Sequence, residues 1–217
     1  MNIINEKRRD FLRKAAVAVT ALPLITSCRA ETVAQIAGDT LLARLRRNGV
    51  SDNWTGASDV PETVSSSTVL SNGTDKGDSI EISGTVFQSD GKTAAAGTLI
   101  YLYHTDLEGY YGRRKDEHRH GRYRGWLLTD TNGRFSFKTI KPAPYPENRW
   151  AAHIHMTVTT ETTREDWIDS ILFEGDRLIT PRERSEAGKR GGFNPILSFE
   201  KGKDGILRAT RNIQLMV

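Results

Sequence analysis

The chain has 217 residues, enough for one compact domain with additional segments. Lysine and arginine total 31 against 27 aspartate and glutamate residues, which gives a formal net charge of +4. The first 27 residues carry five basic and two acidic side chains, so they hold +3 of that charge. The remainder is left with about +1 and gives no support for a nucleic-acid-binding protein.

The N-terminal residues have the pattern of an export signal. A basic stretch at residues 7–14 precedes an apolar stretch at residues 15–25, which is too short to span a bilayer. The letters RRDFLR at residues 8–13 resemble a twin-arginine signal, whose pathway exports folded proteins. We therefore predict a signal peptide at residues 1–27.

Cys28 is the only cysteine in the chain, so it has no partner for an internal disulfide. It follows the letters LITS at residues 24–27, and together they resemble the lipobox of bacterial lipoproteins. The cysteine of a lipobox is acylated and becomes the first residue of the mature protein. We predict a lipid anchor at Cys28 that holds the exported protein to a bacterial membrane in the cell envelope or periplasm. The alternative is a free thiol in a signal cleaved elsewhere.

Residues 28–78 are predicted to form a tether between the anchor and a folded domain. Apolar positions between residues 33 and 45 suit a short helix that ends at Asn48-Gly49. Residues 51–76 are rich in serine, threonine, glycine, asparagine and aspartate, which is typical of a linker or an irregular loop.

Residues 79–217 are predicted to form the domain itself. Short apolar or alternating stretches are separated by glycine and aspartate turns, and Asp130-Thr131-Asn132-Gly133 is a hairpin signal. The C-terminal residues 194–217 have the pattern of a final hairpin. The fold class expected is all-β, a β-sandwich of mostly antiparallel strands with a small N-terminal helical or irregular segment.

A histidine pair and a rigid tyrosine suggest a metal site. His153 and His155 lie two residues apart in a predicted strand, so their imidazoles project from one face. Tyr145 lies between Pro144 and Pro146, which fix their own backbone and stiffen the segment before that strand. A phenol needs a strongly Lewis-acidic ion to lose its proton near neutral pH, which favours ferric iron over zinc. Each motif also suits a structural role, as a hydrogen-bonded histidine pair and a rigid turn.

Three segments in order resemble the intradiol ring-cleavage dioxygenases, a family that includes catechol 1,2- and protocatechuate 3,4-dioxygenases. They lie at residues 103–111, 123–135 and 140–155, and the resemblance covers about residues 79–176. It implies a ferric ion held by two tyrosines and two histidines. The positions that match these ligands are Tyr111, Tyr145, His153 and His155, with Tyr110 at the variable position of the Gly-x-Tyr motif.

The resemblance also implies a reaction. Members of the family cleave a catechol between its two hydroxylated carbons with O2, giving a muconate-type diacid. The catechol chelates the iron, and the tyrosine that it displaces, Tyr145 by the family pattern, can act as a base. We therefore predict an exported Fe(III) dioxygenase with Tyr145 as a catalytic residue. N-terminal helices mediate dimer contacts in other members, so a homodimer is a further expectation.

Two departures from the family pattern concern the substrate. Members commonly have an arginine three residues before the first histidine, but Trp150 occupies that position and Arg149 lies one residue earlier. A shift of one residue on a strand turns a side chain to the opposite face, so a catalytic role for Arg149 requires an irregular loop. Ser170 replaces a glutamine that accompanies this arginine. Trp150 is expected to contact the substrate.

Residues 113–122 form a basic loop that follows Tyr111. We interpret it as a rim that attracts an anionic aromatic acid, although a solvated loop explains it equally well. The side chains that could supply the missing cation are Arg119, Arg122 and Arg124, and we predict Arg122 and Arg124 as substrate-binding residues.

Two alternatives compete with an iron enzyme. His118 and His120 form a second His-x-His motif, so four histidines could bind zinc or copper. The departures at Trp150 and Ser170 also suit a non-catalytic ligand- or metal-binding lipoprotein on the same fold.

Overall fold

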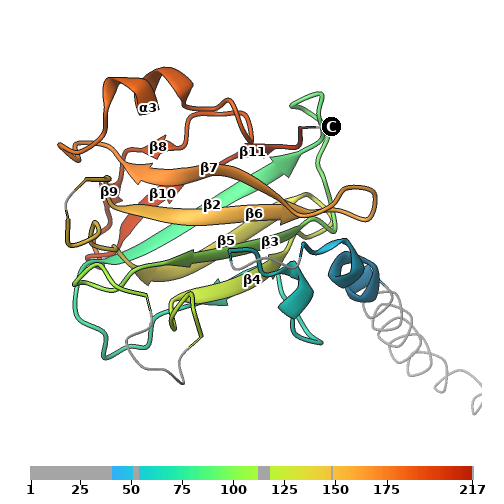
Figure 1. Ribbon diagram of the computed structural model, residues 1–217, viewed down its shortest axis with the longest axis horizontal. Helices are drawn as coiled ribbons and strands as arrows, with labels where there is room; N and C mark the ends of the chain where they lie inside the picture. Colours follow the sequence, from blue (N-terminus) through green and yellow to red (C-terminus); the bar gives the residue numbers. More distant parts are fainter. Residues whose placement is uncertain (1–40, 51–53, 112–117, 148, 217) are drawn as a thin grey trace, which may run out of the picture. The chain divides into compact units, whose positions relative to one another are not determined.

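The computed structural model describes residues 41–50, 54–111, 118–147 and 149–216. Its strands form two sheets, shown in Figure 1, whose facing side chains make one continuous core. Antiparallel pairing predominates in one sheet, whereas the other combines antiparallel and parallel pairs. The predicted all-β sandwich is therefore confirmed.

The first sheet has the strand order β1-β5-β2-β10-β9, with β11 beside the far end of β2. Its strands are β1 (Ser67–Val69), β2 (Ser79–Phe87), β5 (Arg134–Ile140), β9 (Glu200–Lys201), β10 (Leu207–Thr210) and β11 (Ile213–Gln214). The second sheet has the order β4-β3-β6-β7-β8. Its strands are β3 (Leu99–His104), β4 (Arg124–Leu128), β6 (His153–Thr159), β7 (Asp166–Phe173) and β8 (Ile196–Leu197). Short helical segments are η1 (Ala57–Asp59), α3 (Pro181–Glu186) and residues 41–48.

Strand β3 is buried along its whole length, as its nearly continuous apolar sequence predicts. Ile100 and Leu102 contribute to the core between the sheets. The alternate side chains, including Tyr101 and Tyr103, point to the other face, where loops and the N-terminal segment cover them. The second sheet therefore has a covered outer face. Tyr103 pairs with His155 across β3 and β6, so the His155 side chain lies on this same face.

Residues before position 79, where a linker was predicted, contribute to the sandwich. Strand β1 pairs in parallel with β5, and Leu45 and Ala57 pack against Leu99 on the outer face of β3. Residues 1–27 and Cys28 lie outside the described residues. No helix in the described parts of the chain has the length and hydropathy needed to cross a membrane.

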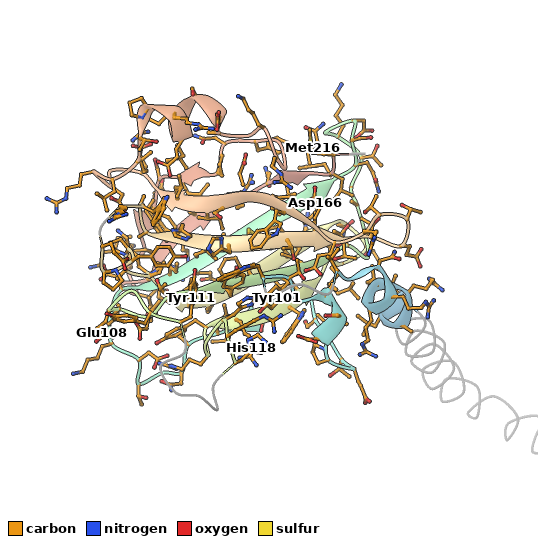
Figure 2. The ribbon with its side chains drawn as sticks, viewed as in Figure 1. Tyr101, Glu108, Tyr111, His118, Asp166 and Met216 are labelled. Atoms are coloured by element: carbon orange, nitrogen blue, oxygen red, sulfur yellow. The ribbon has the colours of Figure 1, made fainter. Side chains whose placement is uncertain are left out.

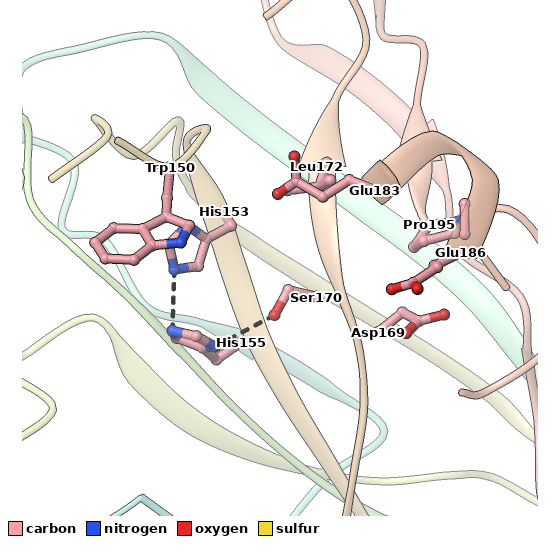
Figure 3. A pocket seen from close by; sticks show the side chains of 10 residues that line it. Trp150, His153, His155, Asp169, Ser170, Leu172, Glu183, Glu186 and Pro195 are labelled. Carbon is pink, nitrogen blue, oxygen red and sulfur yellow. Dashed lines mark hydrogen bonds between the residues drawn. The ribbon is translucent and has the colours of Figure 1, made fainter. Parts of the chain in front are cut away.

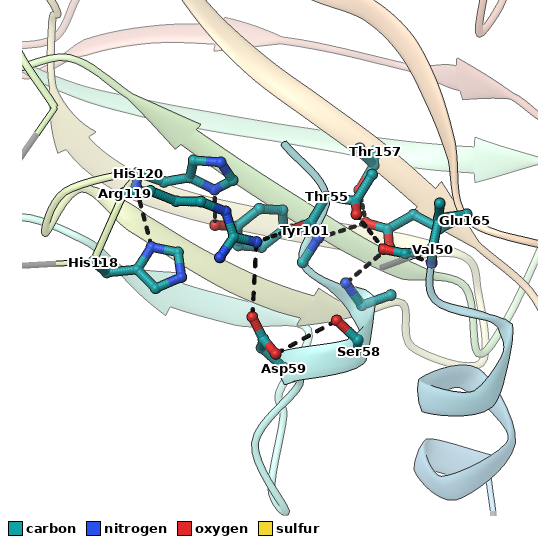
Figure 4. A network of polar contacts seen from close by, with 12 residues as sticks. Val50, Thr55, Ser58, Asp59, Tyr101, His118, Arg119, His120, Thr157 and Glu165 are labelled. Carbon is teal, nitrogen blue, oxygen red and sulfur yellow. Dashed lines mark hydrogen bonds and ion pairs between the residues drawn. The ribbon is translucent and has the colours of Figure 1, made fainter. Parts of the chain in front are cut away.

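A buried carboxylate attaches this N-terminal segment to the second sheet (Figure 4). Glu165 is only 5 % exposed. Its Oε1 accepts hydrogen bonds from the backbone N–H of Gly56 at 2.9 Å and from the Thr157 hydroxyl at 2.7 Å. Its Oε2 accepts from the N–H of Ala57 at 3.0 Å and from that of Val50 at 3.3 Å. One side chain thus satisfies four donors from two distant parts of the sequence.

The C-terminal segment forms more than the predicted hairpin. Strands β9 and β10 do pair antiparallel. Strands β10 and β11 also pair in parallel with β2, so the end of the chain completes the first sheet. Turn residues mark a hairpin locally, whereas parallel pairing with a strand more than a hundred residues away leaves no local signal.

His104, at the end of β3, is a buried neutral imidazole. Its Nδ1 lies 2.7 Å from the Thr105 carbonyl oxygen, which can only accept, so Nδ1 carries the proton. Its Nε2 therefore accepts from the Thr139 hydroxyl at 2.7 Å. Burial lowers the pKa of His104 to about 4.

This histidine should make the fold sensitive to acid. The unfolded chain protonates His104 near pH 6.5 and the folded chain only near pH 4, so protons favour the unfolded state between these values. We expect the free energy of unfolding to fall by about 3 kcal/mol from this residue over that range. Urea denaturation at about pH 7.5, 6 and 4.5 measures the loss. The His104→Leu variant should be less stable at neutral pH but lose less on acidification, and an equal loss in both proteins would contradict the assignment.

Candidate metal centre and pocket

The side chains of the candidate site come from three parts of the chain. His153 and His155 lie on the outer face of β6, while Ile154 between them is fully buried toward the core. Tyr145 lies on the segment that enters β6. Tyr111 follows the turn at residues 106–110, and Figure 2 shows it near Glu108 at one end of the second sheet. Tyr110 is 47 % exposed, so Tyr111 is the tyrosine of this pair that reaches the histidines.

Four side-chain atoms converge at this place. The Nε2 atoms of His153 and His155 are 3.0 Å apart. The Tyr145 hydroxyl lies 3.2 Å from the first and 3.4 Å from the second, and it is hydrogen-bonded to the Tyr111 hydroxyl. Ligand atoms about 2.1 Å from a metal ion lie about 3 to 3.5 Å from one another. The separations among Tyr145, His153 and His155 therefore fit a common coordination sphere, and the hydrogen bond to Tyr145 places the Tyr111 hydroxyl beside it.

The Nδ1 atoms of the two histidines, which face away from the cluster, each have a hydrogen-bond partner. His153 Nδ1 lies 2.7 Å from the Ala151 carbonyl oxygen, so this nitrogen donates its hydrogen and leaves the Nε2 lone pair facing the cluster. His155 Nδ1 lies 3.2 Å from Ser170 Oγ. Contacts of this kind fix the tautomer and the ring orientation of metal-binding histidines.

The electrostatics favour neutral imidazoles and protonated phenols in the absence of a cation. Burial lowers the pKa of His155 well below its usual value, and the nearby His153 and His120 add to that effect. Burial also lowers the pKa of His153, against the opposing effects of the Ala151 carbonyl and the Glu183 charge. Burial raises the pKa of both Tyr111 and Tyr145. Ionisation of the two phenols at neutral pH therefore requires a strongly Lewis-acidic ion, as ferric iron is.

His118 and His120 do not join this centre. The His120 ring stacks on Tyr103 with centroids 3.8 Å apart, and Tyr103 separates it from His155. His120 Nδ1 lies 2.5 Å from the Tyr101 hydroxyl. Figure 4 shows the two side chains directed toward each other. Within the described residues, no three histidine, cysteine, aspartate or glutamate side chains are grouped to hold a metal. The four-histidine alternative is therefore not supported.

A pocket of about 280 Å³ opens beside the two histidines (Figure 3). An apolar cavity of about 150 Å³ is enough for benzene, so this pocket has room for a substituted aromatic ring. Its lining combines the histidine pair with an indole, three carboxylates and small or apolar side chains. The residues are Trp150, His153, His155, Asp169, Ser170, Leu172, Glu183, Glu186, Ala187 and Pro195.

A β-bulge shapes one wall of this pocket. Ile154 pairs with Ile171 and Met156 pairs with Ile168, so two residues of β7 lie opposite His155 alone. These residues are Asp169 and Ser170, and both line the pocket, whereas Ile168 and Ile171 on either side enter the core. The bulge therefore supplies two consecutive pocket residues from one strand.

The predicted arginines lie away from this lining. Arg149 is exposed and is not among the residues that line the pocket, whereas its neighbour Trp150 is. Arg122 pairs with Asp75 and lies over the Tyr123 ring. Arg124 donates to the Gly121 carbonyl oxygen at 2.6 Å. Trp150 is thus the predicted substrate-binding residue that lines the pocket.

The sequence did not indicate the acidic wall. Glu183 and Glu186 come from α3, and Asp169 comes from the bulge. The Thr180–Glu183 capping box could have predicted the start of α3. No local pattern could have shown that this short helix lies beside the histidine strand.

Ser170 should be a positioning residue for His155. Removing its hydroxyl in Ser170→Ala takes away the partner of Nδ1, and loss of such a contact typically lowers metal affinity about 10- to 100-fold. We expect Ser170→Ala to bind ferric iron about tenfold more weakly, as measured by competition with a chelator. Ser170→Thr keeps the hydroxyl and should restore most of the affinity. Equal affinity of the alanine variant and the parent would remove Ser170 from this role.

The chain is similar in sequence to dioxygenases. Residues 57–191 match the family model described as Dioxygenase (Dioxygenase_C). The beta chain of protocatechuate 3,4-dioxygenase from Burkholderia cepacia is 29% identical over 120 residues, which are 51% of this chain and 51% of that protein. Chlorocatechol 1,2-dioxygenase from Pseudomonas putida is 33% identical over 137 residues, covering 50% of this chain and 52% of the relative. The chain thus spans about half the length of these relatives.

Solved structures show the same fold. The dioxygenase domain of a dioxygenase carbohydrate-binding protein fusion from Streptomyces sp. SirexAA-E superposes with a TM-score of 0.53 at 23% identity, over 70% of this chain and 90% of that one. The 3-chlorocatechol 1,2-dioxygenase of Rhodococcus opacus 1CP gives a TM-score of 0.55 at 20% identity, over 71% of this chain and 66% of the other.

Proposed function

The chain belongs to the intradiol ring-cleavage dioxygenase family, and from this membership we propose that it is a non-heme Fe(III) enzyme. It would cleave a catechol-type substrate between its two hydroxylated carbons with O2 and release a muconate-type diacid. The observation that carries the proposal is the convergence of two phenol oxygens and two imidazole nitrogens beside a ring-sized pocket.

Tyr111, Tyr145, His153 and His155 would hold the iron. A bound ferric ion would supply the Lewis acidity that keeps both phenols ionised and makes a chelated catechol reactive toward O2. The two imidazoles are suited to it because burial keeps them neutral and their outer nitrogens are already hydrogen-bonded.

Tyr145 is the catalytic base in this proposal. Its hydroxyl lies within hydrogen-bond reach of Tyr111 and of both histidines. As a phenolate it would accept a proton from a catechol hydroxyl beside it and become a neutral phenol. The Trp150 ring stands edge-on to Tyr145 with centroids 6.0 Å apart, so it lies where it can cover the substrate ring. The catalytic role of Arg149 and the substrate-binding roles of Arg122 and Arg124 stay predictions. They receive no support from the pocket lining, which does not include these residues.

We further propose that the protein is exported and lipid-anchored at Cys28. The support is the basic and apolar pattern of residues 1–27 and the cysteine that follows it. A homodimer is part of the same proposal and rests on the family resemblance. Mass spectrometry of the membrane-bound protein from a bacterial host would detect the acylated Cys28. Full-length, unmodified protein in the cytoplasm would overturn this part.

The visible spectrum tests the iron assignment. The full chain loaded with ferric iron should be coloured by tyrosinate-to-iron charge transfer, and catechol without oxygen should shift the band to longer wavelength. Oxygen should then consume the catechol and yield a diacid that mass spectrometry identifies. The zinc-loaded protein is the matched colourless control. A colourless iron-loaded protein would overturn the proposal.

A second candidate function is a non-catalytic ligand-binding protein on the same fold. The absence of lysine and arginine from the described lining of the pocket favours it, because the family arginine stabilises the developing negative charge. A coloured protein whose band shifts with catechol but that never consumes oxygen would support this candidate over the enzyme.

A further inference from the structure

The wall of the pocket opposite Trp150 is acidic. Asp169 and Glu186 lie side by side across the pocket from Trp150 in Figure 3, and Glu183 lies between them and the Trp150 side. The lining within the described parts of the chain contains no lysine or arginine. A ligand whose ring is held at the histidines would therefore extend its substituent toward three negative charges.

Backbone and side-chain contacts hold two of these carboxylates in place without cancelling their charge. Glu183 Oε2 accepts from the backbone N–H of Thr180 at 2.7 Å and from its hydroxyl at 2.8 Å. Asp169 Oδ2 accepts from the N–H of Gly188 at 2.9 Å and of Arg190 at 3.1 Å. Neutral donors orient a carboxylate and leave its formal charge unchanged.

Two arginines near the pocket form ion pairs with acidic residues outside its lining. Arg184 pairs with Glu174, and Arg190 pairs with Asp166. Glu186 pairs with Arg182 at 3.3 Å and with Lys189 at 3.9 Å, both well exposed, and the negative charge of Asp169 interacts with the buried Arg211. Arg211 approaches the Asp169 backbone oxygen at 3.5 Å, and its other contacts are with backbone carbonyls. The negative field on the pocket is therefore only partly offset.

We propose that this pocket takes catechols whose ring substituent carries a positive charge, such as a protonated alkylamine, and discriminates against those that carry a carboxylate. The inference rests on the proposed function for the same site. It reverses the expectation, drawn from the basic loop, of an anionic aromatic acid.

Three ligands of similar size separate charge from shape. Dopamine, 4-ethylcatechol and 3,4-dihydroxyphenylacetate have a cationic, a neutral and an anionic substituent on the same ring. We would titrate each into the iron-loaded full chain without oxygen and obtain Kd from the shift of the charge-transfer band. Affinity should fall about tenfold from the cation to the neutral ligand and about tenfold again to the anion. Raising sodium chloride from about 50 mM to about 500 mM should reduce both differences in affinity, because salt screens the charges.

Charge-removing variants locate the effect. Glu183→Gln keeps a side chain that can complete the helix cap, so it removes charge with little effect on α3. This variant should bind dopamine about fivefold more weakly and the anion more tightly, with 4-ethylcatechol unchanged. The matched control is Glu62→Gln, an equal loss of charge at an exposed position outside the pocket lining, and its three affinities should equal those of the parent.

The outcomes distinguish this inference from the proposed function. A band that all three ligands shift with equal affinity, or that the anion shifts at the lowest concentration, overturns the charge selectivity and leaves the iron site standing. Equal effects of Glu183→Gln and Glu62→Gln would also overturn it. A protein without the band, or with a band that no catechol shifts, overturns the proposed function and the inference with it.

Discussion

Tyr145→Phe is expected to lower the rate of catechol cleavage by about 10²- to 10⁴-fold, the usual contribution of a general base. The variant loses both the displaceable ligand and the proton acceptor, because a phenylalanine ring has no oxygen within reach of the histidines. Tyr111, His153 and His155 should still hold iron, more weakly, and the remaining tyrosinate should keep part of the colour. Oxygen consumption with catechol and the visible spectrum of the iron-loaded protein measure the two effects.

Tyr110→Phe is the matched control for the tyrosine assignment. This side chain adjoins Tyr111 in sequence but is 47 % exposed, whereas the Tyr111 hydroxyl is hydrogen-bonded to that of Tyr145. The control should keep both colour and turnover within about twofold of the parent. If Tyr110→Phe lost the colour and Tyr111→Phe kept it, the ligand assignment would have to be exchanged.

Glu165→Ala should destabilise the fold by about 3 to 5 kcal/mol. The substitution leaves the buried N–H groups of Gly56 and Ala57 and the Thr157 hydroxyl without their acceptor, and each such group costs about 1 to 3 kcal/mol. Urea denaturation followed by circular dichroism gives the change in free energy of unfolding. Limited proteolysis should also cut the released segment near residues 50–60 faster.

The control for this prediction is Glu161→Ala. Glu161 forms an ion pair with Arg44, but its side chain is 46 % exposed, and exposed pairs are worth about 1 kcal/mol or less. Glu165→Gln keeps one acceptor oxygen and should fall between the two alanine variants. A loss below about 1 kcal/mol for Glu165→Ala would mean that water or a shifted backbone replaces the carboxylate.

Local chemistry explains what the sequence could predict. The strand period of two places His153 and His155 on one face wherever β6 lies, and two prolines restrict Tyr145 whatever surrounds it. Alternating apolar residues likewise identified the sandwich. Each of these expectations depends on residues within one element.

Contacts between distant elements were beyond such patterns. Glu165 meets Gly56 across 109 positions, and nothing in either segment marks the pairing. The acidic residues of α3 approach the histidines only because β7 and the following loop return along the same face. The arginines were assigned to the substrate for their charge, while their neighbours in space, such as Asp75 for Arg122, were hidden from the sequence.

The bulge in β7 gives this family member a way to diverge. In a regular strand one outward position would have to orient His155 and also shape the pocket wall. The extra residue divides these tasks, since Ser170 contacts the imidazole and Asp169 contributes to the wall. If the proposed function holds, selection can change the residue at position 169, and with it the preferred substrate, while the serine and the flanking core isoleucines stay in register. Adaptation of the proposed enzyme to a new aromatic compound would then leave the four candidate iron ligands in place.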